Sequence, residues 1–202
     1  MKRIFLVLLV LFTVTGIEVA LGRPVAPLAA ISNNTAIVLF MDTWEDPPLA
    51  YWEENHPDCV QEWTTRWETL VEPFTINVLV PLAQQLYSKN IPIVFSSNVF
   101  NLSSLFQQDI PNITSTQVLD NYLKQCGIDT IYYVGYTTNI CILTRPTGTR
   151  KMSELGYKVI LVQDATLSTP GYVYAEADAI DEIKSYGSTI LLKQMWRELN
   201  VN

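Results

Sequence analysis

Five short runs of apolar residues, separated by amphipathic stretches, constrain the fold of this chain most strongly. In the first run, Thr35 to Met41, every residue after Thr35 is apolar, which is typical of a strand buried on both faces of a sheet. Similar runs follow at residues 91–96, 130–134, 158–162 and 189–192. We therefore expect an α/β fold: a three-layer, doubly wound parallel sheet of five or six strands, with helices on both faces and right-handed crossovers.

Helical patterns occupy the intervals at residues 63–88, 117–125, 142–155 and 174–186. Pro73 and Pro81 are expected to break or kink the first of these helices, because proline lacks a backbone N–H. Glycines stand just before the third, fourth and fifth strands, at Gly127, Gly156 and Gly187. Each of the three predicts a left-handed helix stop.

The N-terminal residues have the pattern of a cleaved secretory signal. Lys2 and Arg3 precede an apolar run over residues 4–14, and small residues stand before Arg23. The apolar run is shorter than the ~20 residues that a membrane-spanning helix needs. We therefore expect a signal peptide at 1–22, a linker at 23–34, one domain at 35–202, and a secreted or periplasmic protein without membrane attachment after cleavage.

The composition excludes some partners and cofactors. With 20 acidic and 13 basic residues the net charge is −7, and no Lys/Arg stripe is present, so we expect no nucleic-acid partner. No Gly-rich or Ser/Thr-rich phosphate loop follows the first strand, which argues against a flavodoxin-like cofactor carrier. We expect no cofactor.

In such sheets the chemistry gathers beyond the carboxyl ends of the strands. The residues there are Asp42, Ser97-Asn98, Gly135 to Cys141, and Asp164. Cys141 lies where a strand gives way to a helix N-terminus, whose dipole and N–H groups favour a thiolate and can bind an oxyanion. Asp42, at the end of a neighbouring strand, could take the thiol proton. The residues alone allow either this activated nucleophile or a buried structural cysteine beside a helix-capping aspartate.

The segment around Cys141 resembles the isochorismatase-like cysteine hydrolases. Gly135-Tyr136-Thr137-Thr138-Asn139-Ile140-Cys141 is similar to their signature Gly-Val-Ala-Thr-Asn-Val-Cys. Residues 126–130 resemble the Gly-Ile-Asp entry to that strand, and residues 156–159 and 162–166 resemble the Gly-Tyr-x-Val and Asp-Ala-Thr segments. Residues 35–46 more loosely resemble the opening strand with its Asp-x-Gln-x-Asp motif.

This resemblance implies a set of roles. Cys141 would be the nucleophile that forms a covalent adduct, Asp42 its base, and the backbone N–H groups of Thr137 and Cys141 the oxyanion hole. The Tyr136–Thr137 peptide would be cis. The substrate would be a small amide or related molecule, and family members commonly form homo-oligomers. The candidate pocket residues are Trp44, Asn98, Tyr136 and Gln107.

The chain departs from the family at its lysine. The family carries this residue on a strand between the second strand and the helix that leads to the nucleophile strand, but no lysine lies between Lys89 and Lys124. Gln107 or Gln108 falls near the expected position, and glutamine carries no charge. Residues 99–115 are too few for the strand; without it the sheet would have five strands in the order 2-1-3-4-5. A catalytically impaired binding protein on the same fold is therefore the alternative function.

Two further features allow alternatives. His56 is the sole histidine, so the metal site of the nicotinamidase branch cannot be assembled and no metal is expected; we interpret His56 as a loop residue, or otherwise a pocket residue. The sequence Arg-Pro-Thr-Gly-Thr-Arg at 145–150 interrupts the helix after Cys141. There Arg145 or Arg150 contacts an anionic substrate, or the segment is a solvated kink.

The sequence leaves open the role of an aromatic cluster and the pairing of the cysteines. Trp44, Tyr51, Trp52, Trp63 and Trp67 either wall the pocket or, for the last two, pack helices or form an oligomer interface. Cys59 is expected on the active-site side, where a bond to Cys141 would block the nucleophile. Cys126 is expected at the opposite edge of the sheet, too far from Cys141 for a disulfide.

Overall fold

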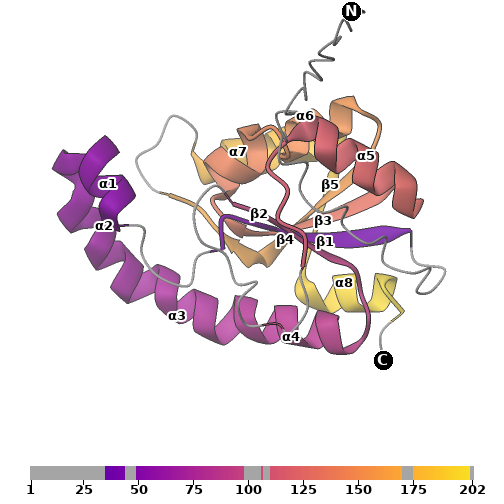
Figure 1. Cartoon of the computed structure of the whole chain (residues 1–202), viewed down its shortest axis with the longest axis horizontal. Helices are drawn as coiled ribbons and strands as arrows, with labels where there is room; N and C mark the ends of the chain where they lie inside the picture. Colours follow the sequence, from indigo (N-terminus) through magenta and orange to yellow (C-terminus); the bar gives the residue numbers. More distant parts are fainter. Residues whose placement is uncertain (1–34, 44–48, 98–105, 107–109, 170–174, 201–202) are drawn as a thin grey trace, which may run out of the picture.

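The computed structural model describes residues 35–43, 49–97, 106, 110–169 and 175–200 (Figure 1). The expected signal peptide and linker lie outside these residues. Among the described helices, none is long and apolar enough to span a bilayer.

One parallel sheet of five strands forms from the described residues, in the order β2-β1-β3-β4-β5. The expected fold class, and the five-strand order expected for a sheet without the additional strand, are confirmed. All strand pairs are parallel, and every β1 residue is buried, as its apolar sequence predicted. The strands are β1 Ala36–Met41, β2 Ile93–Ser96, β3 Thr130–Tyr136, β4 Lys158–Leu167 and β5 Ser188–Ile190.

Beside β2, a short segment takes the place where the additional strand was expected. Asn112 forms a single parallel bridge with Phe95, supported by backbone bonds from Phe95 N–H to the Pro111 carbonyl (2.9 Å) and from Ile113 N–H to the Phe95 carbonyl (2.8 Å). The Asn112 side chain continues this pairing, since its amide exchanges two 3.0 Å hydrogen bonds with the backbone of Ser97. In the described residues, this edge of the sheet is thus a bridge rather than a strand.

Helices cover both faces of the sheet (Figure 1). One face packs against α5 Thr116–Cys126, α6 Thr149–Glu154 and α7 Glu176–Tyr186, and its core includes Leu39 and Met41 of β1. The other face packs against α4 Val80–Ser88 and α8 Leu192–Glu198, and its core includes Val38 and Phe40. Because side chains alternate along a strand, β1 supplies both cores. Sequence analysis did not foresee α8, which is short and buries Met195.

The two prolines do not interrupt the helix that precedes β2. The chain is helical through α1 Leu49–Asn55, η1 Pro57–Cys59, α2 Val60–Arg66, η2 Trp67–Val71, α3 Glu72–Phe74, η3 Thr75–Leu79 and α4. The segments η2 and η3 are π-helical, and the N–H groups of Glu72 and Val80 bond five residues back, just before Pro73 and Pro81. The wider turns accommodate each ring, so of the two predicted effects the helix shows a local distortion at each proline and no break.

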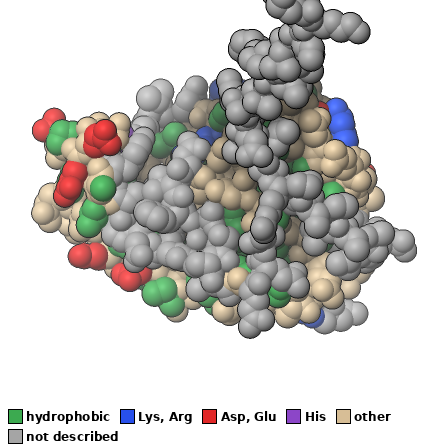
Figure 2. Space-filling view, viewed as in Figure 1, with side chains coloured by type: hydrophobic (Ala, Val, Ile, Leu, Met, Phe, Trp, Pro, Cys, Tyr) green, Lys and Arg blue, Asp and Glu red, His purple; other side chains and the backbone are tan. Residues whose placement is uncertain are grey.

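The first part of this helix, residues 49–66, forms an arm that extends beyond the sheet (Figure 1). Acidic side chains gather on it (Figure 2), where Glu53, Glu54, Asp58 and Glu62 are exposed. Arg66 donates a hydrogen bond to the Ser168 carbonyl, which ties the base of the arm to the end of β4.

Two of the three predicted glycine stops are confirmed. Gly127 and Gly156 have φ of 67° and 91°. Gly187 has φ −141°, so the left-handed stop predicted there was wrong. A Cβ at Gly187 would lie 2.6 Å from the Val159 carbonyl oxygen, and the residue is therefore needed for the close approach of this turn to β4.

Candidate active site

The site begins where β1 and β3 end side by side. Met41 pairs with Gly135, and a Cβ on Gly135 would lie 2.2 Å from the Met41 carbonyl oxygen, so only glycine permits this approach. The next residue, Asp42, has φ 46°, a left-handed conformation that aspartate tolerates better than most residues. Its N–H donates to the Ser96 carbonyl of β2 at 3.0 Å. The two neighbouring strands thus fix the backbone of Asp42.

Cys141 lies in the short π-helical segment η5 Thr138–Ile142 that follows β3. Thr137 is the N-cap of this segment, and the Tyr136–Thr137 peptide bond is cis. The buried Asn139 side chain fixes the turn: its amide N–H donates to the Thr169 carbonyl (2.8 Å) and its oxygen accepts from Thr169 N–H (3.0 Å). The predicted nucleophile is therefore held between β3 and the residues that follow β4.

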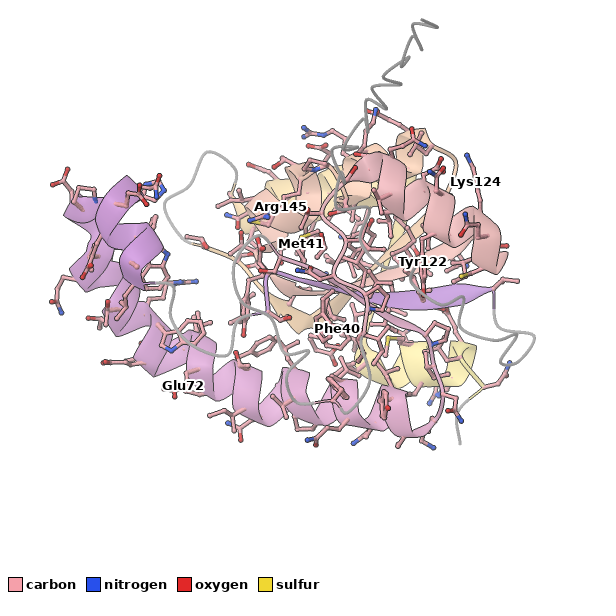
Figure 3. The ribbon with its side chains drawn as sticks, viewed as in Figure 1. Phe40, Met41, Glu72, Tyr122, Lys124 and Arg145 are labelled. Carbon is pink, nitrogen blue, oxygen red and sulfur yellow. The ribbon has the colours of Figure 1, made fainter. Side chains whose placement is uncertain are left out.

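Arg145 brings a positive charge close to Asp42. One of its terminal nitrogens lies 2.7 Å from a carboxylate oxygen of Asp42, and the Asp42 side chain is 1% exposed against 24% for Arg145. Figure 3 shows Arg145 at the end of the sheet where Met41 lies. The solvated-kink interpretation of 145–150 was wrong, because Thr147 and Thr149 are fully buried. Arg150, by contrast, pairs with Glu182 of α7.

These groups alter one another's protonation. Burial raises the pKa of Asp42 to about 6, while Arg145, the Cys141 thiol and Ser97 oppose that rise. Neither Asp42 oxygen receives a well-aligned hydrogen bond from the described residues, so the ion pair with Arg145 is the main favourable interaction of the carboxylate.

The environment of Cys141 favours the neutral thiol over the thiolate. Burial and the negative charge of Asp42 raise its pKa, and Arg145 lowers it. The helix N-terminus suggested a stabilised thiolate, but here desolvation outweighs that effect. With a pKa of about 6 the Asp42 carboxylate is mostly ionised at neutral pH, so it can take the thiol proton during attack and activate the sulfur as a nucleophile.

The remaining predicted pocket residues are not assembled in the described structure. Trp44, Asn98 and Gln107 lie outside the described residues. Tyr136 belongs to the core on the α4 side of the sheet, whereas Cys141 packs on the opposite side. Its hydroxyl bonds the Thr75 hydroxyl and the Val71 carbonyl, so it holds the long helix rather than facing the thiol.

Asp164, at the expected end of the fourth strand, serves a different purpose. β4 continues to Leu167 through an irregularity that shifts its pairing with β3 between Tyr133 and Gly135. Asp164 lies on this irregular part and accepts a 2.7 Å hydrogen bond from Leu192 N–H at the start of α8. It caps a helix and does not join the site.

The aromatic residues of the arm pack on one another. The ring centroids of Trp52 and Trp63 are 5.6 Å apart, and the ring of His56, between α1 and η1, packs at a tilt against Trp63 with a centroid distance of 4.9 Å. Trp67 is buried in η2, while nothing of the Tyr51 side chain is described. Helix packing is thus the observed role of Trp52 and Trp63.

The described residues form neither a disulfide nor a cluster of metal-ligating side chains. All three cysteines are free thiols, so the Cys59–Cys141 disulfide considered from the sequence is not formed. No cluster of three or more His, Cys, Asp or Glu side chains with metal-binding geometry occurs in the described ranges.

Sequence reasoning placed Ser97 and Asn139 at the carboxyl edge of the sheet without their contacts, and it missed the role of Arg145 as the partner of Asp42. The signal for Arg145 was its spacing, since a residue four positions after Cys141 lies on the same helix face. The Ser97 and Asn139 contacts join distant parts of the chain and left no local signal.

Solved structures share this fold at low sequence identity. A cysteine hydrolase from Pseudomonas syringae pv. phaseolicola is 16% identical with a TM-score of 0.54, covering 89% of this chain and 96% of the other. YcaC from Pseudomonas aeruginosa is 19% identical (TM-score 0.52; 81% and 82% covered). A nicotinamidase from Staphylococcus aureus is 17% identical (TM-score 0.53; 78% and 97% covered). No curated protein matches the chain in sequence.

Part of the sequence also matches a family model. Residues 103–194 match the isochorismatase domain, a range that contains β3, Cys141 and Arg145 and leaves Asp42 to be placed by the fold. The match covers the segment whose motifs carried the resemblance, and the sheet order agrees with it. This chain is therefore similar to the isochorismatase domain over residues 103–194, and it shares the fold of solved isochorismatase-like hydrolases.

Proposed function

We propose that this protein is a hydrolase that cleaves a small amide-like or related substrate through a covalent intermediate on Cys141, with Asp42 as general base. The observation that carries this proposal is the placement of the two residues, because Asp42 directly follows β1 and Cys141 lies in the segment after the neighbouring strand β3. Each interacts with the other strongly enough to alter its pKa, at the adjoining ends of two parallel strands. A thiol beside a buried base is the arrangement that nucleophilic catalysis requires.

In the first half of the reaction, the Cys141 proton passes to Asp42 as the sulfur bonds to the substrate's carbonyl carbon. The electron pair of the C=O bond moves to the oxygen, which the backbone N–H groups of Thr137 and Cys141 would receive. When the tetrahedral intermediate collapses, the C–N bond breaks and the leaving nitrogen takes the proton from Asp42.

In the second half, water adds to the thioester and gives a proton to Asp42. The C–S bond then breaks, and the Cys141 sulfur takes this proton back as the acid product leaves. Asp42 therefore accepts a proton in each addition and returns it in each collapse. A pKa of about 6 suits this role, because the carboxylate is ionised at neutral pH yet remains basic.

The test is an intact-mass measurement after incubation with a panel of small amides and with acrylamide. Acrylamide is covalently bound in the YcaC structure, which makes it a suitable probe. We expect an adduct on the wild type and none at residue 141 in Cys141→Ala, with Cys59→Ser as the matched control that keeps the adduct. Turnover of at least one amide should disappear in Cys141→Ala.

The competing function is a binding protein on the same fold, which the missing lysine suggested. If the wild type forms no Cys141 adduct and hydrolyses no amide, while Cys141→Ala still binds the same ligands, the hydrolase proposal is wrong. We disfavour nicotinamide as the substrate, because the sole histidine packs against Trp63 in the arm.

We further propose export with cleavage before Arg23, on the basis of the N-terminal pattern alone. N-terminal sequencing of protein recovered from the medium or periplasm tests it, and a mature chain that retains residues 1–22 would contradict it. Homo-oligomer formation, which the family resemblance implies, stays a prediction for light scattering.

A further inference from the structure

We propose that Arg145 is a positioning residue of the catalytic centre: its guanidinium holds the Asp42 carboxylate beside Cys141 and offsets the negative charge that moves between them. This inference rests on the proposed function. It starts from the 2.7 Å ion pair between Arg145 and the almost fully buried Asp42. A buried carboxylate without a partner is strongly disfavoured in its charged form, and therefore as a base.

Arg145 lies four residues after Cys141, and this spacing places its side chain near both Asp42 and Cys141. Arg145 N–H donates to the Cys141 carbonyl at 3.1 Å, so the two residues lie one helical turn apart and on the same face. That face meets the end of β1. Arg145 consequently influences Asp42 and Cys141 in the same direction, lowering the pKa of each. At this site the pKa values of Asp42 and Cys141 are shifted by each other and by Arg145, and Ser97 adds a neutral contact to Asp42.

The turn that carries Arg145 is anchored from three separate elements. The Thr147 hydroxyl bonds the Ser96 hydroxyl at the end of β2 (2.6 Å), and the Thr147 carbonyl accepts from the Tyr133 hydroxyl of β3 (2.9 Å). At the start of α5, the Thr116 hydroxyl donates to the Pro146 carbonyl at 2.6 Å. Arginines on solvated kinks have no such support.

Gly148 closes the turn on the Arg145 backbone. Its N–H donates to the Arg145 carbonyl at 2.8 Å, and a Cβ at this position would lie 3.0 Å from the Arg145 nitrogen and oxygen and 2.7 Å from the Ile142 oxygen. The backbone of Arg145 is therefore fixed before any substrate arrives. A fixed charge needs no reorganisation when the reaction begins.

Arginine suits this position because its guanidinium remains protonated when it is partly buried. During attack, negative charge leaves Asp42 as it accepts the proton and develops on the sulfur and then on the substrate oxygen. Arg145 keeps its own protons throughout and attracts the charge at both Asp42 and Cys141. It would thus supply from the helix after Cys141 the positive charge that the chain lacks between Lys89 and Lys124.

The experiment compares Arg145→Gln and Arg145→Lys with Arg150→Gln, which removes an arginine that pairs with Glu182 on α7. Peptide mapping measures iodoacetamide alkylation of Cys141 as a function of pH, and kcat/KM for the reactive amide is measured in parallel. In Arg145→Gln the pKa of both Asp42 and Cys141 rises, so alkylation at neutral pH falls about tenfold or more and its profile moves to higher pH. Arg145→Lys recovers most of the loss, and Arg150→Gln retains the wild-type rate and profile.

The proposal is overturned if Arg145→Gln alkylates with the wild-type rate and pH profile, or if Arg145→Lys is as impaired as Arg145→Gln while both remain folded by circular dichroism. Should Arg145→Gln not fold, the position of the Arg145→Lys profile relative to Arg150→Gln decides in the same way. The two proposals fail separately: a shifted alkylation profile without any wild-type turnover supports Arg145 and contradicts the hydrolase, whereas turnover with an unshifted profile does the reverse.

Discussion

The described residues that flank Asp42 beyond β2 and beyond β3 differ in their burial and in their number of hydrogen bonds. On the β2 side, the described residues beyond the sheet make one bridge, at Asn112, and their contact to Ser97 depends on an exposed amide side chain. On the β3 side, the segment from Cys141 to Gly148 is buried for much of its length and bonded to β2, β3 and α5. The positive charge beside the buried Asp42 carboxylate thus comes from Arg145, on the side where the described residues are held by several hydrogen bonds.

The largest effect is expected when Asp42, which both sides share, loses its charge. Asp42→Asn removes the proposed base, and kcat/KM should fall by about 10² to 10⁴-fold. The thiol should also alkylate more slowly at neutral pH, because no carboxylate remains to accept its proton. Wild-type-like turnover in Asp42→Asn would show that another group is the base.

Stability should respond to the same substitution in a pH-dependent way. Because the folded-state pKa of Asp42 is raised to about 6, the folded protein binds the extra proton between about pH 4 and about pH 6, and the wild type loses stability as pH rises through this window. Asp42→Asn lacks that loss. Its free energy of unfolding relative to wild type should therefore increase by up to about 3 kcal/mol across the window. Urea unfolding at both ends measures this, and a constant difference would contradict the raised pKa.

The next largest effect tests the turn on the β3 side. In Gly148→Ala the added Cβ meets the Ile142 and Arg145 backbone, so we expect a loss of about 1–3 kcal/mol in the free energy of unfolding, together with slower Cys141 alkylation as Arg145 shifts. Gly127→Asn is the control, because its site is open and asparagine tolerates positive φ. Equal effects of the two substitutions would mean that the turn is not tightly fitted.

A smaller effect is expected at the link between the two sides. Ser96→Ala leaves the fully buried Thr147 hydroxyl without its partner from β2, at a cost of about 1–2 kcal/mol in urea unfolding. The matched control is Ser88→Ala, whose exposed hydroxyl bonds only the Gln85 carbonyl in its own helix and should cost less than about 0.5 kcal/mol.

The smallest effect should come from the β2 side. Asn112→Ala removes the exposed amide that pairs with the Ser97 backbone, and we expect a loss of about 0.5–1 kcal/mol, with Cys141 alkylation changed by less than about threefold. If alkylation falls as far as in Gly148→Ala, the β2 side controls the site as strongly as the arginine turn, and the comparison above is wrong.

Several elements could be predicted from local sequence because local physics decides them. The apolar runs predicted all five strands, and the positions of Asp42 and Cys141 after neighbouring strands followed from the α/β pattern. The break at 145–148 was also predicted, since proline and glycine act on their own backbone. At Pro73 and Pro81 the same rule predicted a break or a kink, and widened helical turns absorbed both rings without a break.

By itself, the sequence determined the α/β fold class, the resemblance to the isochorismatase domain and the residues that reach the carboxyl edge of the sheet, because periodicity and turn chemistry depend on a few neighbouring residues. The tertiary structure alone decided that Arg145 faces Asp42, that Tyr136 and Asp164 serve packing and capping, and that the environment of Cys141 favours the neutral thiol. Those outcomes depend on burial and on charges brought together from distant positions. Desolvation and Coulomb interactions act through space, so local sequence patterns do not reveal them.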